Sequence, residues 1–398
     1  MKNQTAKNYK RTLSACYMGF ITQAIVANFV PLLFVIFHTE MGISLGKIAL
    51  IPTVFFFTQL LVDLVCARFV DMIGYRSCVV ASEVLAALGL VLLAVLPGFF
   101  KDPFIGILIC VFLYAVGSGL IEVLVSPIVE ACPFDNKEGV MSLLHSFYCW
   151  GCVGVILIST LLLRLFGAQN WKRIACIWAI IPIINIFNFL TCPIEHLTKE
   201  GEGYSIRQLL SLPMFWICIV LMICAGASEL SMAQWSSAYA ESALGFSKTV
   251  GDVAGPCMFA VTMGISRVFY GKFGKKIKLI NFMTGSGILC VICYLLVAVS
   301  NRPFWGLAGC ILCGASVGIM WPGTISITSA KIPLGGTAMF ALLAMAGDLG
   351  GSIGPALVGI VSQSTGDNLH AGMAVGMLFP IILIISVILL RNSKHQKA

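Results

Sequence analysis

The chain has 398 residues, of which 59% are hydrophobic and 11% are charged. Soluble globular domains carry about 25% charged residues and about 45–50% apolar ones, so this chain has too little charge to coat soluble domains. Its apolar residues also fall in long uncharged runs, such as 105–116, 174–190 and 374–390. About 20 apolar residues cross the hydrocarbon core as a helix, and lipid offers no partners to exposed backbone groups. The sequence therefore predicts an all-α membrane protein.

Twelve spans are expected, joined by short loops on alternate sides of the bilayer. Their ranges are 12–37, 46–70, 77–99, 103–131, 139–165, 171–192, 211–240, 247–271, 278–299, 303–331, 336–363 and 371–390. With the N-terminus inside, most of the 25 basic residues, Arg267 among them, fall in inside segments. This positive-inside bias sets topology, so the net charge of +8 does not indicate a nucleic-acid partner. The prediction is a plasma (inner) membrane protein with both termini cytoplasmic.

The two halves of the chain repeat weakly around a polar stretch at 195–207. Met-Gly-Ile-Ser at 41–44 is echoed by Leu-Gly-Phe-Ser at 244–247. The eight-residue spacing from Gly119 to Pro127 recurs from Gly314 to Pro322. The expected domains are therefore one six-helix bundle at 1–192, a cytoplasmic linker at 193–210 and a second bundle at 211–398.

A family resemblance is carried by the loop at 67–76, Ala-Arg-Phe-Val-Asp-Met-Ile-Gly-Tyr-Arg. It resembles the loop motif of the major facilitator superfamily, in which a small residue, an Asp, a Gly and a basic residue recur between helices 2 and 3. The family prefers Gly where this chain has Ala67, and 267–276 resembles a degenerate copy. The resemblance covers the whole chain and implies two pseudo-symmetric six-helix bundles. Transporters built from such repeats bind solute between them near the midplane.

Three stretches resemble the fucose/glucose/galactose-type sugar:proton symporters of this superfamily, namely 117–127, 226–235 and 314–323. The chain departs from that group at Ser126, where Asn usually precedes the proline. It also lacks an Arg in the span 336–363, where facilitators often have one. The resemblance implies a sugar as the solute and a proton as the coupling ion, with sodium left open.

Glu122 is the leading candidate for the proton-coupling residue. A charge at the bilayer centre costs several kcal/mol, so an ionisable group there is a functional candidate. Residues four apart share a helix face, so Ser118, Glu122 and Ser126 form one polar stripe beside Pro127. Alternatively, Glu122 is a structural group bonded to Ser118 or Ser126. Asp348 and His145 are further candidates for the proton path.

The expected substrate-binding residues are side chains that suit a sugar. Indole rings stack on its C–H groups, and carboxylates and amides bond its hydroxyls. These residues are Glu229, Gln234, Trp235, Trp321, Asn28 and Gln23. Glu229 and Gln234 diverge by about 140° on a straight helix, so either the helix unwinds there or only one faces the cavity. The two Trp residues could instead be interfacial or packing aromatics.

Four charged residues are assigned to gating, and one glycine run to packing. Asp71, Arg76 and Glu130 lie at the expected cytoplasmic ends of their spans, and Asp63 lies deeper, eight residues before Asp71. The Gly-xxx-Gly spacings in 347–359 indicate close helix packing.

Cys149 and Cys152 form a CxxC pair on one helix face with Ser142 and His145. Such side chains could bind a soft metal or act in redox chemistry. However, sixteen cysteines make one CxxC unsurprising, and no second cluster completes a site. No metal, cofactor or structural disulfide is expected.

Three functional hypotheses follow. The first is a monomeric secondary transporter that takes up a small polar solute, with a sugar favoured, by proton symport through alternating access. The second is a facilitator-type efflux antiporter of amphiphilic or drug-like molecules. The third is a membrane sensor or redox protein that transports nothing. No enzymatic activity is expected, and no P-loop is present to use ATP.

Overall fold

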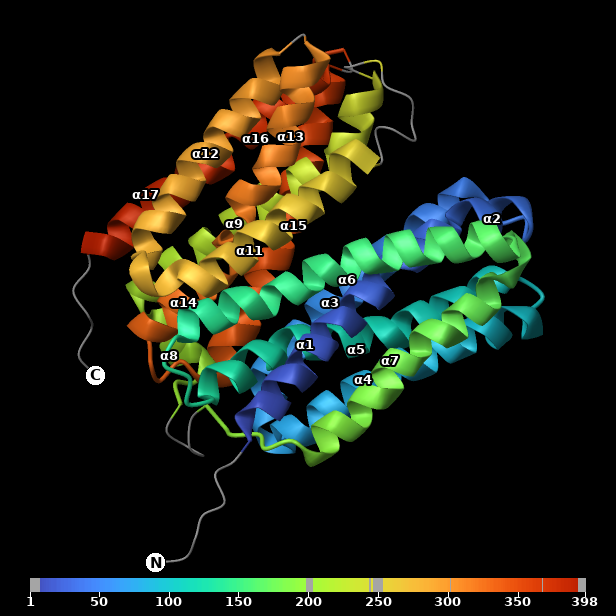
Figure 1. Ribbon diagram of the computed structural model, residues 1–398, viewed down its shortest axis with the longest axis horizontal. Helices are drawn as coiled ribbons and strands as arrows, with labels where there is room; N and C mark the ends of the chain where they lie inside the picture. Colours follow the sequence, from blue (N-terminus) through green and yellow to red (C-terminus); the bar gives the residue numbers. More distant parts are fainter. Residues whose placement is uncertain are drawn as a thin grey trace, which may run out of the picture. The chain divides into compact units, whose positions relative to one another are not determined.

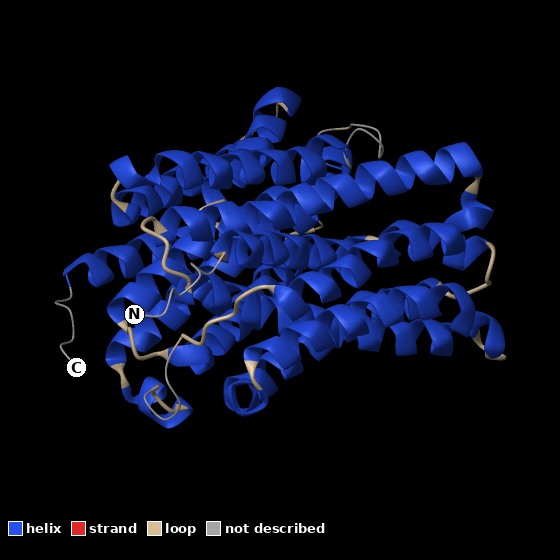
Figure 2. Ribbon diagram, turned by 60° about the horizontal axis from the view of Figure 1, so that its bottom comes forward, coloured by secondary structure: helices blue, strands red, loops and turns tan. Residues whose placement is uncertain are grey.

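A computed structural model describes residues 8–197, 203–242, 245, 253–300, 302–366 and 368–392 (Figure 1). All regular elements in these ranges are helices (Figure 2). Eleven described helical segments are long and apolar enough to cross a membrane. The predicted span 247–271 is described from Val253 onward, and the predicted echo at 244–247 lies outside the described residues except for Gly245. The prediction of an all-α, multi-pass membrane protein is confirmed.

The first compact unit comprises Met1–Pro133 and Trp150–Glu202. Its elements are α1 (Tyr9–Asn28), η1 (Val30–Leu33), α2 (Phe34–Thr39), α3 (Leu45–Ile73), α4 (Tyr75–Val95), η2 (Leu96–Phe99), α5 (Pro103–Ala131), the later part of α6 (Lys137–Phe166), η3 (Ala168–Asn170) and α7 (Trp171–Thr191). Polar caps start two of the long helices, because Ser44 accepts the N–H of Lys47 and Asp102 accepts that of Phe104. Helix α4 packs against α5 and α7, and α1 also packs on both of them.

The second unit comprises Phe134–Cys149 and Gly203–Ala398, so it includes the first part of α6. Its other elements are α8 (Ile206–Ser211), α9 (Pro213–Ser242), the π-turn η4 (Val253–Cys257), α11 (Met258–Phe273), η5 (Gly274–Lys276), α12 (Leu279–Val299), α13 (Pro303–Val317), α14 (Met320–Lys331), α15 (Gly336–Ser364), α16 (Leu369–Gly376) and α17 (Leu378–Asn392). Residues 198–202 of the predicted linker lie outside the described residues. The predicted boundaries between bundles stay a prediction.

Prolines explain where predicted spans are interrupted. A proline has no N–H, so the carbonyl four residues earlier loses its helical partner. The span 303–331 is divided between α13 and α14 at Gly318, four residues before Pro322. The span 371–390 is divided near Gly376, four residues before Pro380. Pro31 lies in the 3-10 turn that interrupts the first span.

Glycines allow α9 and α15 to pack closely, as predicted for the run at 347–359. A Cβ on Gly354 would lie 2.8 Å from the carbonyl oxygen of Ala227, and a Cβ on Gly226 would collide with the backbone of Gly347. The two glycines of the sequence repeat each allow a close approach of helices. Gly119 of α5 lies against α3, and Gly314 of α13 lies against α11. Close packing through small residues is typical of membrane helices.

Candidate functional site

Glu122 lies at a junction of three helices in the first unit. Its Oε2 accepts a hydrogen bond of 2.9 Å from Gln23 Nε2 on α1 and another from Gln59 Nε2 on α3. Both glutamines are buried, whereas Glu122 on α5 is half-buried. Two amide donors on one oxygen can stabilise a carboxylate away from water. The geometry thus joins Glu122 to Gln23, and it adds Gln59, which was not among the predicted site residues.

Two other predicted residues of the first unit lie near this junction along their helices. Asp63, one turn beyond Gln59 on α3, is fully buried. Asn28, at the end of α1, donates through Nδ2 to the carbonyl of Ala24 at 2.9 Å, and that nitrogen lies 3.2 Å from Cys152 Sγ. Their roles in gating and in binding hydroxyls stay predictions.

A second buried carboxyl, Glu83 on α4, was not predicted. Its Oε2 accepts from Thr22 Oγ1 of α1 at 2.9 Å, and its Oε1 accepts from Asn185 Nδ2 of α7 at 2.7 Å. Asn185 Nδ2 also lies 3.0 Å from the carbonyl oxygen of Ala15. Glu83 is fully buried, and the network ties three helices together. Its position inside the span 77–99 meets the same criterion as Glu122, so the sequence carried the signal.

The three residues assigned to gating at the helix ends have different surroundings. Arg76 donates to the carbonyls of Phe189, Leu190 and Cys192 at 2.5–2.8 Å, which caps the C-terminal end of α7. Asp71 is exposed and Glu130 is buried. Arg76 thus has a defined structural task, and the gating role of all three stays a prediction.

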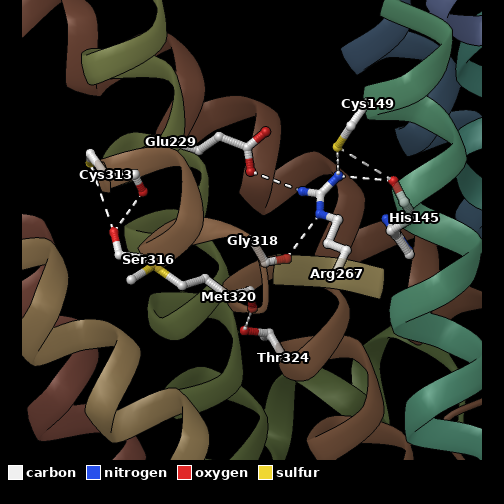
Figure 3. A network of polar contacts seen from close by, with 9 residues as sticks. All are labelled: His145, Cys149, Glu229, Arg267, Cys313, Ser316, Gly318, Met320 and Thr324. Carbon is white, nitrogen blue, oxygen red and sulfur yellow. Dashed lines mark hydrogen bonds and ion pairs between the residues drawn. The ribbon is translucent and has the colours of Figure 1, made fainter. Parts of the chain in front are cut away.

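Arg267 of α11 is the centre of a polar network in the second unit (Figure 3). Its Nη2 pairs with Glu229 Oε2 at 3.3 Å, and its Nη1 donates to the carbonyl of His145 at 3.0 Å and lies 3.1 Å from Cys149 Sγ. Arg267 was predicted to be one of the basic residues of the inside segments, and that placement stays a prediction. The side chain is only 3% exposed, because its charge and hydrogen bonds are satisfied within the protein.

The proline in the second repeat creates one acceptor for Arg267. Pro322 cannot donate to the carbonyl of Gly318, and that oxygen instead accepts from Arg267 Nε at 2.9 Å. On the other side, Ser142 Oγ of α6 donates to the carbonyl of Arg267 at 2.8 Å. The network therefore joins α6, α9, α11 and the break between α13 and α14.

The face of α6 that carries the CxxC pair is divided between these networks. Cys149 contacts Arg267, whereas Cys152 contacts Asn28. The His145 side chain is buried. The sixteen cysteines are free, and the described residues contain no group of three or more potential metal ligands. A role for His145 in a proton path stays a prediction.

The spacing of Glu229 and Gln234 requires either that the helix unwinds between them or that only one of them faces the cavity. Helix α9 is continuous from Pro213 to Ser242, so it does not unwind between the two residues. Glu229 is 13% exposed and faces Arg267, while Gln234 is exposed. The two side chains therefore diverge, and at most one of them can serve a common binding surface.

Trp235 and Trp321, the predicted aromatic contacts, both pack against α15, and Asp348 is part of that helix. Trp235 Nε1 donates to the carbonyl of Pro355 at 2.9 Å, and the ring of Trp321 packs on Gly347. Both rings are half-buried. The next residue, Asp348, is half-buried too, and its Oδ2 is buried with no hydrogen-bond partner among the described residues. Convergence of Asp348, Glu229 and Glu122 on one cavity stays a prediction.

Comparison with known proteins agrees with this architecture. The sequence profile of the Major Facilitator Superfamily matches residues 15–355. The structure is similar to that of FucP, a Major Facilitator Superfamily transporter in the outward conformation, with a TM-score of 0.82 and 16% identity over 96% of this chain and 99% of that one. It is also similar to the E. coli fucose:proton symporter FucP in a variant form, with a TM-score of 0.81 and 15% identity over 96% and 98% of the two chains.

A third similar structure is the proton:xylose symporter XylE bound to 6-bromo-6-deoxy-D-glucose. Its TM-score is 0.81 and its identity 11%, over 96% of this chain and 95% of that one. No curated protein matches the sequence significantly. At these identities the structural likeness establishes the fold, and the profile covers most of the chain. The chain therefore belongs to the Major Facilitator Superfamily of membrane transporters.

Proposed function

We propose that this transporter takes up a small polar solute, with a sugar as the favoured class, by proton symport in the plasma membrane. Glu122 is the proposed proton carrier. The observation that carries the proposal is the junction at Glu122, where Gln23 and Gln59 from two other helices donate to one carboxylate oxygen. The similar structures are those of FucP, a fucose:proton symporter, and XylE, a proton:xylose symporter, and they support the choice of solute and ion.

The proton step has a simple physical basis. Protonation of Glu122 removes a charge whose burial is costly in the membrane. It also replaces the carboxylate that accepts from Gln23 and Gln59 with a neutral carboxyl group. Gln23 and Gln59 can then rotate and offer hydrogen-bonding groups to a solute hydroxyl. Binding of proton and solute are coupled in this way, and the coupling must be reciprocal. A junction rich in amides suits a hydroxylated solute better than an amphiphilic one.

The test is Glu122→Gln in proteoliposomes, after a thermal-shift screen of purified protein against a sugar panel has identified a ligand. Gln keeps the side-chain volume and hydrogen-bonding capacity but cannot ionise. The variant should therefore exchange solute across the membrane yet fail to accumulate it under a pH gradient. Its solute affinity should also lose its pH dependence, because linkage requires a titrating group.

Glu40→Gln is the matched control, because Glu40 is exposed at the end of α2. It should accumulate solute as the wild type does. If Glu122→Gln also accumulates solute normally, the carrier role passes to Glu229, Asp348 or His145, or the coupling ion is sodium. If no sugar shifts the unfolding temperature but amphiphilic compounds do, the efflux hypothesis replaces this one.

A further inference from the structure

A groove of about 580 Å³ lies between α11 and α12 in the second unit. Its walls are apolar side chains one or two turns apart, Ile265 and Phe269 on α11 and Phe282 and Leu289 on α12. Ile265, Phe269 and Leu289 are 36–54% exposed. The groove belongs to none of the three polar networks described above, at Glu122, Glu83 and Arg267.

The groove exists because the residues between its walls are small. Helices α11 and α12 each pack against α13, and the side chains at the bottom are Ser266, Ser286 and Ala315. Gly285 adds to the space, since a Cβ built there would meet nothing within 4 Å. The serines are almost fully buried, so the surface offered to an occupant is mainly hydrocarbon.

One end of the groove opens beside a cluster of positive charge. Ile277 lines the groove and lies between Lys276 and Lys278 in the sequence. These two lysines and Lys275 form the lysine cluster, and all three are exposed. No Asp or Glu occurs between residues 258 and 302. One carboxylate from α6 lies nearby, because Glu138 accepts from the Tyr270 hydroxyl, which also lies 3.5 Å from the carbonyl oxygen of Ile277, so three lysines and one carboxylate leave this end net positive. Apolar surface thus runs directly into a cationic patch.

The length of the groove fits half a bilayer. Eleven residues separate Lys278 from Leu289, which is about 16 Å along a helix at 1.5 Å per residue. One leaflet contributes about 15 Å of hydrocarbon. With the lysine cluster at the headgroup layer, the groove therefore reaches about as deep as a single leaflet.

We propose that this groove and the lysine cluster bind one anionic glycerophospholipid. The phosphate lies on the lysine cluster, and one acyl chain lies between α11 and α12 over Gly285. Basic pockets between membrane helices suit anionic headgroups, and each nearby lysine strengthens binding roughly five-fold. The exposed Asn281 amide, which lines the groove one turn from Lys278, can donate to the same headgroup.

The test is native mass spectrometry of the full chain in micelles with equal phosphatidylglycerol and phosphatidylcholine. The wild type should retain one phosphatidylglycerol in preference. Lys276→Gln with Lys278→Gln should reduce that preference roughly 25-fold, from two lysines. Gly285→Leu should displace the lipid by filling the groove, at a position where an added Cβ meets nothing within 4 Å.

Two matched controls separate these effects from nonspecific ones. Gly154→Leu makes the same change at another helical glycine with open space around it. Lys10→Gln with Arg207→Gln removes two exposed charges elsewhere. Both controls should bind as the wild type does, and thermal unfolding should show that all variants are folded.

Four results would overturn the proposal. Equal retention of both lipids, or an unchanged preference in the lysine variant, would exclude headgroup recognition. Unchanged retention in Gly285→Leu would exclude the groove as the acyl site. A dimer that Gly285→Leu converts to monomer would show that a second copy of the chain covers this face instead.

Discussion

Arg267→Gln removes the charge that pairs with Glu229 together with the hydrogen bonds to Gly318 and His145. Breaking a buried ion pair by removing one partner costs about 3–5 kcal/mol, because the other charge stays buried. Each lost hydrogen bond to a carbonyl adds about 1 kcal/mol, and the glutamine can recover part of this. We expect Arg267→Gln to lower the local free energy of opening by about 4–6 kcal/mol.

The double variant separates the ion pair from the remaining hydrogen bonds. Glu229→Gln alone should cost about 1–3 kcal/mol, since the amide oxygen still accepts from Arg267 and the other three contacts remain. Adding Glu229→Gln to Arg267→Gln removes the orphaned carboxylate. The double variant should therefore be less destabilised than the sum of the two single variants, with a coupling free energy of about 2 kcal/mol.

Cys149 provides the assay. It is fully buried and contacts Arg267, so its alkylation by a maleimide requires local opening of the network. Labelling rates of the Cys149 peptide, measured by mass spectrometry, then report the free energy of opening for each variant. Arg207→Gln, at an exposed residue, should leave the rate unchanged. A coupling free energy near zero would refute the assignment of Glu229 and Arg267 as an energetically significant pair.

Three further predictions concern stability. Glu83→Ala should lower the free energy of unfolding in detergent by about 3–5 kcal/mol, because it leaves a cavity and orphans the donors that include Thr22; thermal unfolding that matches the wild type would contradict this. Gly226→Leu should cost at least about 1–3 kcal/mol by forcing α9 from α15, and an unchanged unfolding temperature would exclude the close approach. The pKa of Asp102 is held below its usual value by the hydrogen bond from Lys47 and by the N–H of Phe104. The stabilisation from this contact is present at neutral pH and is lost as the pH falls through the folded-state pKa. Asp102→Asn should therefore remove that part of the acid sensitivity in a thermal-unfolding series from pH 7 to pH 3.

The spans could be predicted because membrane insertion depends on local composition. An uncharged run of sufficient length suffices, and the range expected for α5, 103–131, is the one observed. Where the structure divides a span, as at Gly318, the division follows from the proline four residues later. However, Pro127 and Pro355 lie inside continuous helices. A proline therefore marks where a break can occur, and the packing around it decides whether the helix is divided.

The hydrogen-bond partners of the polar residues could not be predicted from the sequence. Periodicity indicates which face of a helix a residue occupies, but it does not identify the helix that packs against that face. Glu122 could be placed on a stripe with two serines, yet its described hydrogen bonds come from Gln23 and Gln59, 99 and 63 residues away. Arg267 was counted among the inside basic residues, because basic residues mark the inside ends of spans. Only packing of four helix segments reveals that its charge is compensated internally.

The two carboxyls differ in what a proton would do to their surroundings. Each repeat has a proline at the matching position, Pro127 inside the continuous helix α5 and Pro322 after the break between α13 and α14. Only the second repeat has an arginine, Arg267, at the position occupied by Ala67 in the first. A proton on Glu229 would remove the counter-charge of a guanidinium that is 3% exposed, and that loss is costly. A proton on Glu122 would neutralise the carboxylate that accepts from the amides of Gln23 and Gln59. These amides carry no charge and can reorient. The smaller penalty at Glu122 is the physical reason to place the proton step in the first unit, and to expect Glu229→Gln to weaken solute binding without uncoupling transport.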